Sequence, residues 1–262
     1  MVSAIALLVL SGFLLPGVGN ALDAGVEEVD DCLRSNLPEK TSRQRVDLEC
    51  KDRTGGVRTL DANLFWRRGK DDRSETMIEV EGPPEDRGSR YLAIAHKDRT
   101  DTWVCLPELQ RVRRIHPRSA DGQLFCTDFS YEDIQHLQRV PERARAKRLS
   151  DATLDGRDVR MVHSDTSELE GSSYHHIIYQ VDAQTCLPLK IEFFETAEDL
   201  RKRLTTDPDS FIRSGESWVA QKVRMEDLGT GTTSQILVKD IELEADVPAR
   251  MFTLSNMERR CR

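Results

Sequence analysis

The sequence lacks the short motifs that mark the common enzyme classes. It has no GxSxG nucleophile elbow, no HExxH pair, no P-loop and no Rossmann glycine pattern. The spaced glycines of "DLGTGTTSQ" (227–235) are better explained by a turn between two strands. The adjacent histidines His175 and His176 would point to opposite faces of a strand, so they would not bind one ligand together. These absences predict a protein that is not an enzyme and has no catalytic residue.

Metal-binding spacing is absent as well. No cysteine belongs to a CxxC, and no His/Cys cluster has the spacing of a zinc site, so we expect no metal and no cofactor. In an oxidising compartment an even number of cysteines permits disulfides. Cys105 and Cys126 are a candidate pair because they flank one expected hairpin region. Our interpretation is a mixture of buried free thiols and one or two bridges, and the even count leaves three bridges as the alternative. The chain has six cysteines: Cys32, Cys50, Cys105, Cys126, Cys186 and Cys261.

An excess of basic charge is also missing. The formal net charge is −8 at pH 7, which argues against general affinity for the phosphates of nucleic acid. Charged residues make up 32% of the chain but are dispersed along it, which is typical of solvated strand faces and not of disorder.

Long apolar runs are confined to the first residues. An apolar stretch from Ala4 to Leu15 precedes Pro16 and the small residues around Ala21, which predicts a signal peptide over residues 1–21. Because no cysteine stands at the cleavage point, we expect a protein released into the periplasm and not a lipoprotein. No Lys or Arg precedes the apolar run, which leaves a retained anchor as the alternative. The remaining residues, 22–262, are expected to form one domain.

Alternation of apolar and polar residues recurs along most of this part. In "QRVDLECKD" (44–52) Val46, Leu48 and Cys50 share one face, and "CLPLKIEFFE" (186–195) has the same pattern. Strands at this density, separated by Gly, Asp and Pro turns, predict an antiparallel sheet with one apolar face. Only residues 22–36 and 130–137 indicate helices, the second opening on Ser130 and Asp133 as in a capping box.

Three strings of the central region are similar to a known family. "MIEVEGPPEDRGSRYLAI" (77–94), "TWVCLPELQRVRRI" (102–115) and "TDFSYEDI" (127–134) resemble segments of the bacterial outer-membrane lipoprotein-sorting-like proteins, a branch of the LolA-like superfamily. The resemblance implies a mainly β (α+β) fold: a curved antiparallel sheet that forms an open half-barrel, with helices covering its concave side. It also implies a carrier that takes lipid or the acyl part of lipoproteins through the envelope.

A carrier of this kind needs an apolar lining for its hydrophobic cup. Each methylene transferred from water into such a cup gains about 0.8 kcal/mol, so acyl chains need no specific polar site. We expect a monomer that exchanges lipid or lipoprotein acyl chains with an inner-membrane exporter or an outer-membrane acceptor. The alternative is an interaction module that accompanies an exporter and binds no lipid, its apolar residues forming an ordinary core. The candidate lining residues are Trp66, Trp103, Leu106, Phe129, Ile178 and Phe193.

Three clustered arginines require an explanation of their own. On a strand, Arg111 and Arg113 would point one way with Ile115, while Arg114 points the other way, so they would not form a one-sided basic groove. Our interpretation is that they fasten the strand to the following helix through carboxylates, which arginine forks bind well. The alternative is that one arginine at the rim of the cup meets a lipid phosphate or an acidic partner. The expected carboxylate partners are Asp128, Glu132 and Asp133.

Overall fold

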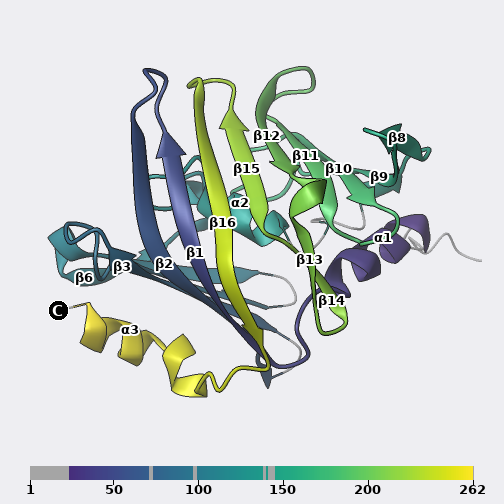
Figure 1. Cartoon of the computed structure of the whole chain (residues 1–262). Helices are drawn as coiled ribbons and strands as arrows, with labels where there is room; N and C mark the ends of the chain where they lie inside the picture. Colours follow the sequence, from purple (N-terminus) through teal and green to yellow (C-terminus); the bar gives the residue numbers. More distant parts are fainter. Residues whose placement is uncertain (1–23, 71–72, 97–98, 138–139, 141–144, 262) are drawn as a thin grey trace, which may run out of the picture.

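The computed structural model describes residues 24–70, 73–96, 99–137, 140 and 145–261. The expected signal peptide lies outside these residues. Fourteen of the strands in the described residues enter one large antiparallel sheet, which is the main feature of the fold (Figure 1). Its strands are β1 (Thr41–Lys51), β2 (Val57–Arg68), β3 (Ser74–Gly82), β4 (Arg90–Ala95), β5 (Thr100–Leu106), β6 (Arg111–Ile115), β7 (Ala146–Arg148), β8 (Ala152–Leu154), β9 (Arg157–Asp165), β10 (His176–Asp182), β11 (Pro188–Phe194), β12 (Leu200–Thr206), β15 (Lys222–Asp227) and β16 (Thr232–Leu243).

The order of the strands explains how the sheet grows in two directions. The first six strands form a meander that ends at β6, and β16 returns to pair with β1. From β16 the sheet continues through β15, β12, β11, β10 and β9 to β7, with β8 also paired to β9. β6 and β7 therefore end the sheet on opposite sides, and the sheet curves without closing (Figure 1). The predicted open half-barrel is confirmed.

Three α-helices and a small hairpin complete the architecture of the described residues. The helices are α1 (Ala24–Arg34), α2 (Tyr131–His136) and α3 (Leu254–Arg260), and the hairpin consists of β13 (Phe211–Ser214) and β14 (Ser217–Ala220). α2 begins with the predicted capping box, in which the Ser130 hydroxyl accepts from the Asp133 N–H and the Asp133 carboxylate accepts from the Ser130 N–H. No helix among the described residues has the length and apolar character needed to cross a membrane.

The two faces of the sheet pack against different helices. On β3, Ile78 and Val80 belong to a core cluster shared with α1 and the segment around α2, whereas Met77 between them belongs to a cluster shared with α3. We call the first face the concave side and the second the outer face. The expected helices α1 and α2 cover the concave side, and α3, which the sequence pattern did not indicate, packs on the outer face.

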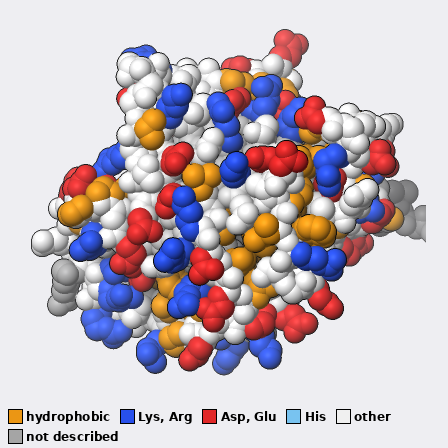
Figure 2. Space-filling model, viewed as in Figure 1, with side chains coloured by type: hydrophobic (Ala, Val, Ile, Leu, Met, Phe, Trp, Pro, Cys, Tyr) orange, Lys and Arg blue, Asp and Glu red, His pale blue; other side chains and the backbone are white. Residues whose placement is uncertain are grey.

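The outer face of β1 and β16 is polar. Arg43 pairs with Glu242 at 2.6 Å and Lys239 with Asp47 at 2.7 Å, and these side chains alternate with the buried Val46 and its neighbours. Figure 2 shows basic and acidic side chains interspersed over these strands. The alternation predicted for residues 44–52 is thus realised, with one apolar and one solvated face.

All six cysteines form disulfides, which join parts of the chain that are distant in sequence. The bridges are Cys32–Cys186, Cys50–Cys126 and Cys105–Cys261. The expected pairing of Cys105 with Cys126 is wrong, because Cys105 lies on the outer face against α3 whereas Cys126 lies in the segment over the concave side. The interpretation that some thiols remain free is wrong as well, because all six cysteines are paired.

Candidate functional site

A short segment of the chain covers the concave side together with α1. We call residues 120–137, which include α2, the cover segment. Its side chains Leu124, Phe129 and Tyr131 are buried in the concave core. The ring of Tyr131 stacks on Tyr91 of β4, with centroids 5.8 Å apart and planes 8° from parallel. α2 lies within the curve of the sheet (Figure 1), and the aromatic side chains of the cover segment are buried in the concave core.

A buried ion pair fastens α2 to the sheet. Lys202 of β12 projects into the concave side, and its Nζ lies 2.8 Å from Asp133 Oδ2 and 2.8 Å from the Asp128 carbonyl oxygen. The Tyr174 hydroxyl donates to the other oxygen of Asp133 at 2.7 Å. Burial, and then the Asp133 carboxylate, raise the pKa of Tyr174 well above its ordinary value, so the phenol remains a donor. Asp133 is thus fully bonded although it is buried.

Two further carboxylates of the cover segment are bonded to neighbouring elements. Asp128 accepts from the Ser234 hydroxyl at 2.6 Å and from Thr232, both on β16. Glu132 accepts from Ser172 at 2.5 Å and lies 3.4 Å from His136. Burial alone would raise the pKa of Glu132, but the hydrogen bonds from His136 and Ser172 outweigh it and place the pKa below its ordinary value. These contacts hold the cover segment to β16 and to the loop before β10.

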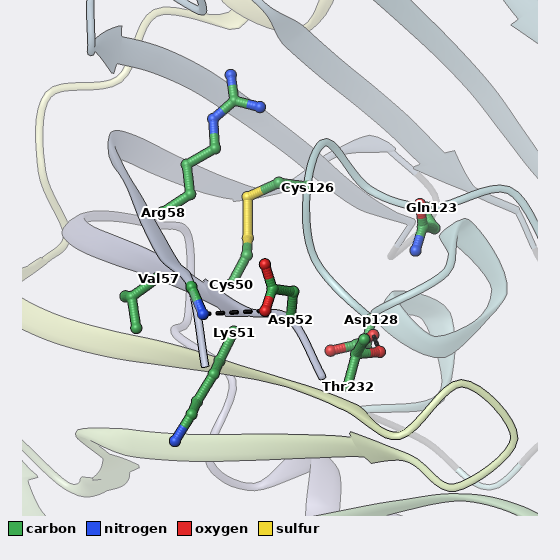
Figure 3. Close-up of a pocket in the computed structure, with 10 residues that line it drawn as sticks. Cys50, Lys51, Asp52, Val57, Arg58, Gln123, Cys126, Asp128 and Thr232 are labelled. Atoms are coloured by element: carbon green, nitrogen blue, oxygen red, sulfur yellow. Dashed lines mark hydrogen bonds between the residues drawn. A yellow bond between two sulfur atoms is a disulfide. The ribbon is translucent and has the colours of Figure 1, made fainter. Parts of the chain in front are cut away.

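A disulfide and a pocket mark the mouth of the concave side. The Cys50–Cys126 bridge joins the cover segment to β1, and a cavity of about 320 Å³ adjoins it (Figure 3). Figure 3 shows Asp128 and Thr232 side by side, while Lys51 and Arg58 extend away from the disulfide. The pocket is lined by Cys50, Lys51, Asp52, Gly56, Val57, Arg58, Gln123, Cys126, Asp128 and Thr232. Because most of these side chains are polar, the pocket itself is not an acyl-chain site.

A second cavity of about 400 Å³ lies at the β8–β9 hairpin. Its lining includes Asp151, Asp158 and Arg160, so it too is polar. Within the part of the chain that the structure describes, no group of three His, Cys, Asp or Glu residues could hold a metal ion.

The structure brings only some of the predicted lining residues to the concave core. Phe129 and Phe193 are fully buried there. Trp66 is buried on β2 and donates its ring N–H to Ser74. Leu106 is half-buried at the end of β5.

The other two predicted lining residues lie on the outer face. Trp103 packs against the cluster beneath α3. Ile178 stands between Ile177 and Tyr179, which both face the concave core, so its own side chain points outward. The reason is that neighbouring strand positions alternate between faces, and the sequence alone does not say which face becomes concave.

The predicted pairing of the arginines with the cover segment does not occur. Arg114 pairs with Asp101 of β5 at 2.6 Å, on the outer face. Arg111 and Arg113 are exposed and form no ion pair with any residue in the described ranges. Lys202 takes the place expected of an arginine at Asp133.

Sequence reasoning missed Lys202 and Tyr174. In "LRKRLTT" Lys202 shares its strand face with the buried Leu204, so a charge on the apolar face was a readable signal. Tyr174 lies in a loop before β10 and gave no comparable signal.

Comparison with known proteins identifies the architecture. A family model described as "uncharacterized protein" matches residues 72–259, which is more than half of the chain. No curated protein matches the sequence.

Three solved structures share the fold. A putative outer membrane lipoprotein-sorting protein domain from Vibrio parahaemolyticus superposes with a TM-score of 0.78 at 22% identity, covering 88% of this chain and 97% of that one. A DUF1329 family protein from Desulfovibrio piger superposes with a TM-score of 0.80 at 20% identity, covering 90% of this chain and 98% of that one. A LolA superfamily protein from Nitrosomonas europaea superposes with a TM-score of 0.66 at 16% identity, covering 88% of this chain and 98% of that one.

Proposed function

The chain belongs to the outer-membrane lipoprotein-sorting-like proteins of the LolA-like superfamily, and from that membership we propose that it is a carrier for acyl chains. The cargo is a lipid or the acyl part of a lipoprotein, and the binding surface is the concave side. The proposed function is binding and transfer, with no chemical step.

One observation carries this proposal. The sheet is open, and the apolar residues of its concave side are covered by α1 and the short cover segment instead of a second sheet. Displacing the cover segment would expose a continuous apolar surface that includes Tyr91, Ile191 and Phe193. Acyl chains laid on such a surface gain about 25 cal/mol for each Å² removed from water.

The cover segment must move before cargo enters, since its aromatic side chains occupy the concave core. The attachments that resist this movement are the Cys50–Cys126 disulfide and the Lys202–Asp133 pair. We propose that the present conformation is the cargo-free, closed form of the carrier.

Three disulfides favour an oxidising compartment. We therefore place the carrier in the periplasm, where it would receive cargo from an inner-membrane exporter and deliver it to an outer-membrane acceptor. The remaining predicted lining residues, Trp66 and Leu106, would border the binding surface.

The filled concave side supports a second candidate function, in which the protein is an interaction module that binds no lipid. Phe129 and Tyr131 already bury the surface that an acyl chain would need. In this case the cover segment is a permanent part of the core.

Uptake of an apolar probe distinguishes the two functions. Replacement of Cys50 and Cys126 by Ser removes the covalent tether of the cover segment, and we expect stronger binding of a fluorescent fatty acid. The matched control replaces Cys105 and Cys261 by Ser, which removes a bridge on the outer face. Native mass spectrometry of protein purified from periplasm should show a lipid-sized adduct.

Bare protein in the mass spectrum, together with no fatty-acid binding by either variant, would overturn the carrier proposal in favour of the interaction module. If fatty-acid binding increases equally in both variants, the cause is a general loosening of the fold. That outcome would also contradict the proposal that the cover segment controls access to the concave side.

A further inference from the structure

We propose that the free edge of β6 (Arg111–Ile115) is a docking site for an extended acidic segment of a partner protein, which joins the sheet as an additional strand. This site is separate from the concave core and does not depend on the cargo proposed above.

The edge of the sheet is open at β6. β6 is the terminal strand of the 14-stranded sheet and pairs with β5 alone, as its place at the left of Figure 1 shows. Within the described residues no backbone group of Arg111–Ile115 bonds to a loop or to another element. A terminal strand of this kind presents a row of unpaired N–H and C=O groups that can accept a further strand.

The register places two arginines on one face of this edge. Arg113 lies opposite Val104 and Arg111 opposite Leu106, and Val104 belongs to the concave core. Both arginines therefore stand on the concave side, two residues apart, and both are exposed. Since neither forms an ion pair in the described part of the chain, their charges are available to a partner.

The opposite face of the same edge carries one apolar side chain and one paired arginine. Val112 points away from the arginines and packs, half-buried, against the outer-face cluster beneath α3. Its neighbour Arg114 is already paired with Asp101. Along the edge, the apolar Val112 therefore lies between two arginines, Arg111 and Arg113, that are unpaired within the described residues.

An added strand would place its side chains directly beside these positions, about 4.5–5.5 Å away between Cβ atoms. Carboxylates opposite Arg111 and Arg113 would form charge-assisted hydrogen bonds with the guanidinium forks. An apolar residue between them would lie against Val112. The pattern that fits is acidic, apolar, acidic in an extended conformation.

Charge complementarity selects this occupant over two others. A second copy of β6 would bring arginines against arginines across the new strand pair, and like charges directly opposite each other are destabilising. A lipid phosphate could bind the guanidinium groups but would leave the backbone groups of the edge without a partner.

The experiment uses the purified protein and a short labelled peptide with Thr-Glu-Val-Glu-Thr at its centre. Fluorescence anisotropy should detect binding, and hydrogen exchange should show added protection of amides in Arg111–Ile115. A peptide with Gln in place of both Glu should bind about tenfold more weakly. The double substitution Arg111→Glu/Arg113→Glu should lower the affinity for the Glu peptide by a similar factor or more.

The matched control, Arg53→Glu/Lys147→Glu, makes the same change of charge at two exposed residues away from β6 and should leave peptide affinity unchanged. Equal binding of the Glu and Gln peptides, or no protection at β6, would overturn the proposal. Two further outcomes would overturn the proposal. In the first, the Glu peptide binds neither protein, whereas Arg111→Glu/Arg113→Glu abolishes binding to phosphatidylglycerol vesicles. In the second, the same double substitution abolishes a self-association of the wild-type chain.

Discussion

Lys202 Nζ lies 2.8 Å from Asp133 Oδ2, inside the half-barrel, where the two side chains are 10% and 0% exposed. The pair joins a strand to the helix of the cover segment across 69 residues of sequence. Because both side chains are buried, removal of one partner should destabilise the fold strongly.

Lys202→Met should therefore lower the free energy of unfolding by about 3–5 kcal/mol, because the Asp133 carboxylate would remain buried without its cation. Urea unfolding measures the change. Lys222→Met is the control, since its pair with Asp207 is exposed and its loss should cost less than about 1 kcal/mol. Equal effects of the two substitutions would contradict the assigned role, and adding Asp133→Asn to Lys202→Met should recover part of the loss.

Asp182 provides a test by pH. It accepts two hydrogen bonds from Arg157, at 2.8 and 2.9 Å, and two from Thr185. Burial opposes ionisation, but the bonds from Arg157 and Thr185 outweigh it and place the pKa of Asp182 below its ordinary value of 3.8.

A carboxyl group with a lowered pKa in the folded state stabilises the fold above its ordinary pKa and loses that contribution as pH falls. The wild-type protein should lose stability below about pH 4, and part of that loss should be absent in Asp182→Asn. Unfolding free energies measured across the acid range test this. Parallel pH profiles of the two proteins would assign the acid sensitivity to other carboxylates.

The Cys105–Cys261 bridge ties α3 to the outer face. Replacing both cysteines by Ser should cost about 2–5 kcal/mol and increase hydrogen exchange throughout α3. The concave core should keep its protection, because α1 and the cover segment do not contact this cluster. Arg260→Ala, which removes the contacts to the Glu79 carboxylate at 2.8 and 3.2 Å and leaves the bridge intact, serves as the milder comparison. Unchanged exchange in α3 would show that packing alone holds the helix.

Arg113→Ala tests the reassigned arginines. Because Arg113 is exposed and unpaired among the described residues, its loss should change the free energy of unfolding by no more than about 0.5 kcal/mol. A clear drop in thermal stability would support the original interpretation, in which this arginine fastens β6 to the cover segment. Arg157→Ala, which breaks the bonds to the buried Asp182, should be measurably destabilising in the same assay.

Local features of the sequence determined much of this fold. The alternation around Val46 and Leu48 identified a half-buried strand, and Ser130 with Asp133 identified the start of α2. Both signals depend on residues within a few positions of each other, and such contacts form in the same way wherever the segment lies. The curvature of the sheet was predicted from the family resemblance, because alternation alone does not encode it.

Only the tertiary structure decided the long-range partners. Cys105 bonds Cys261 across 156 residues, and Asp133 pairs with Lys202 and not with the nearby arginines. These outcomes depend on strand order and on which face of the sheet becomes concave. Alternation assigns Trp103 and Val104 to opposite faces, but it does not say which face meets the cover segment and which meets α3. That choice is made when distant strands pair and the sheet bends, so it is a property of the assembled sheet and not of any single stretch of sequence.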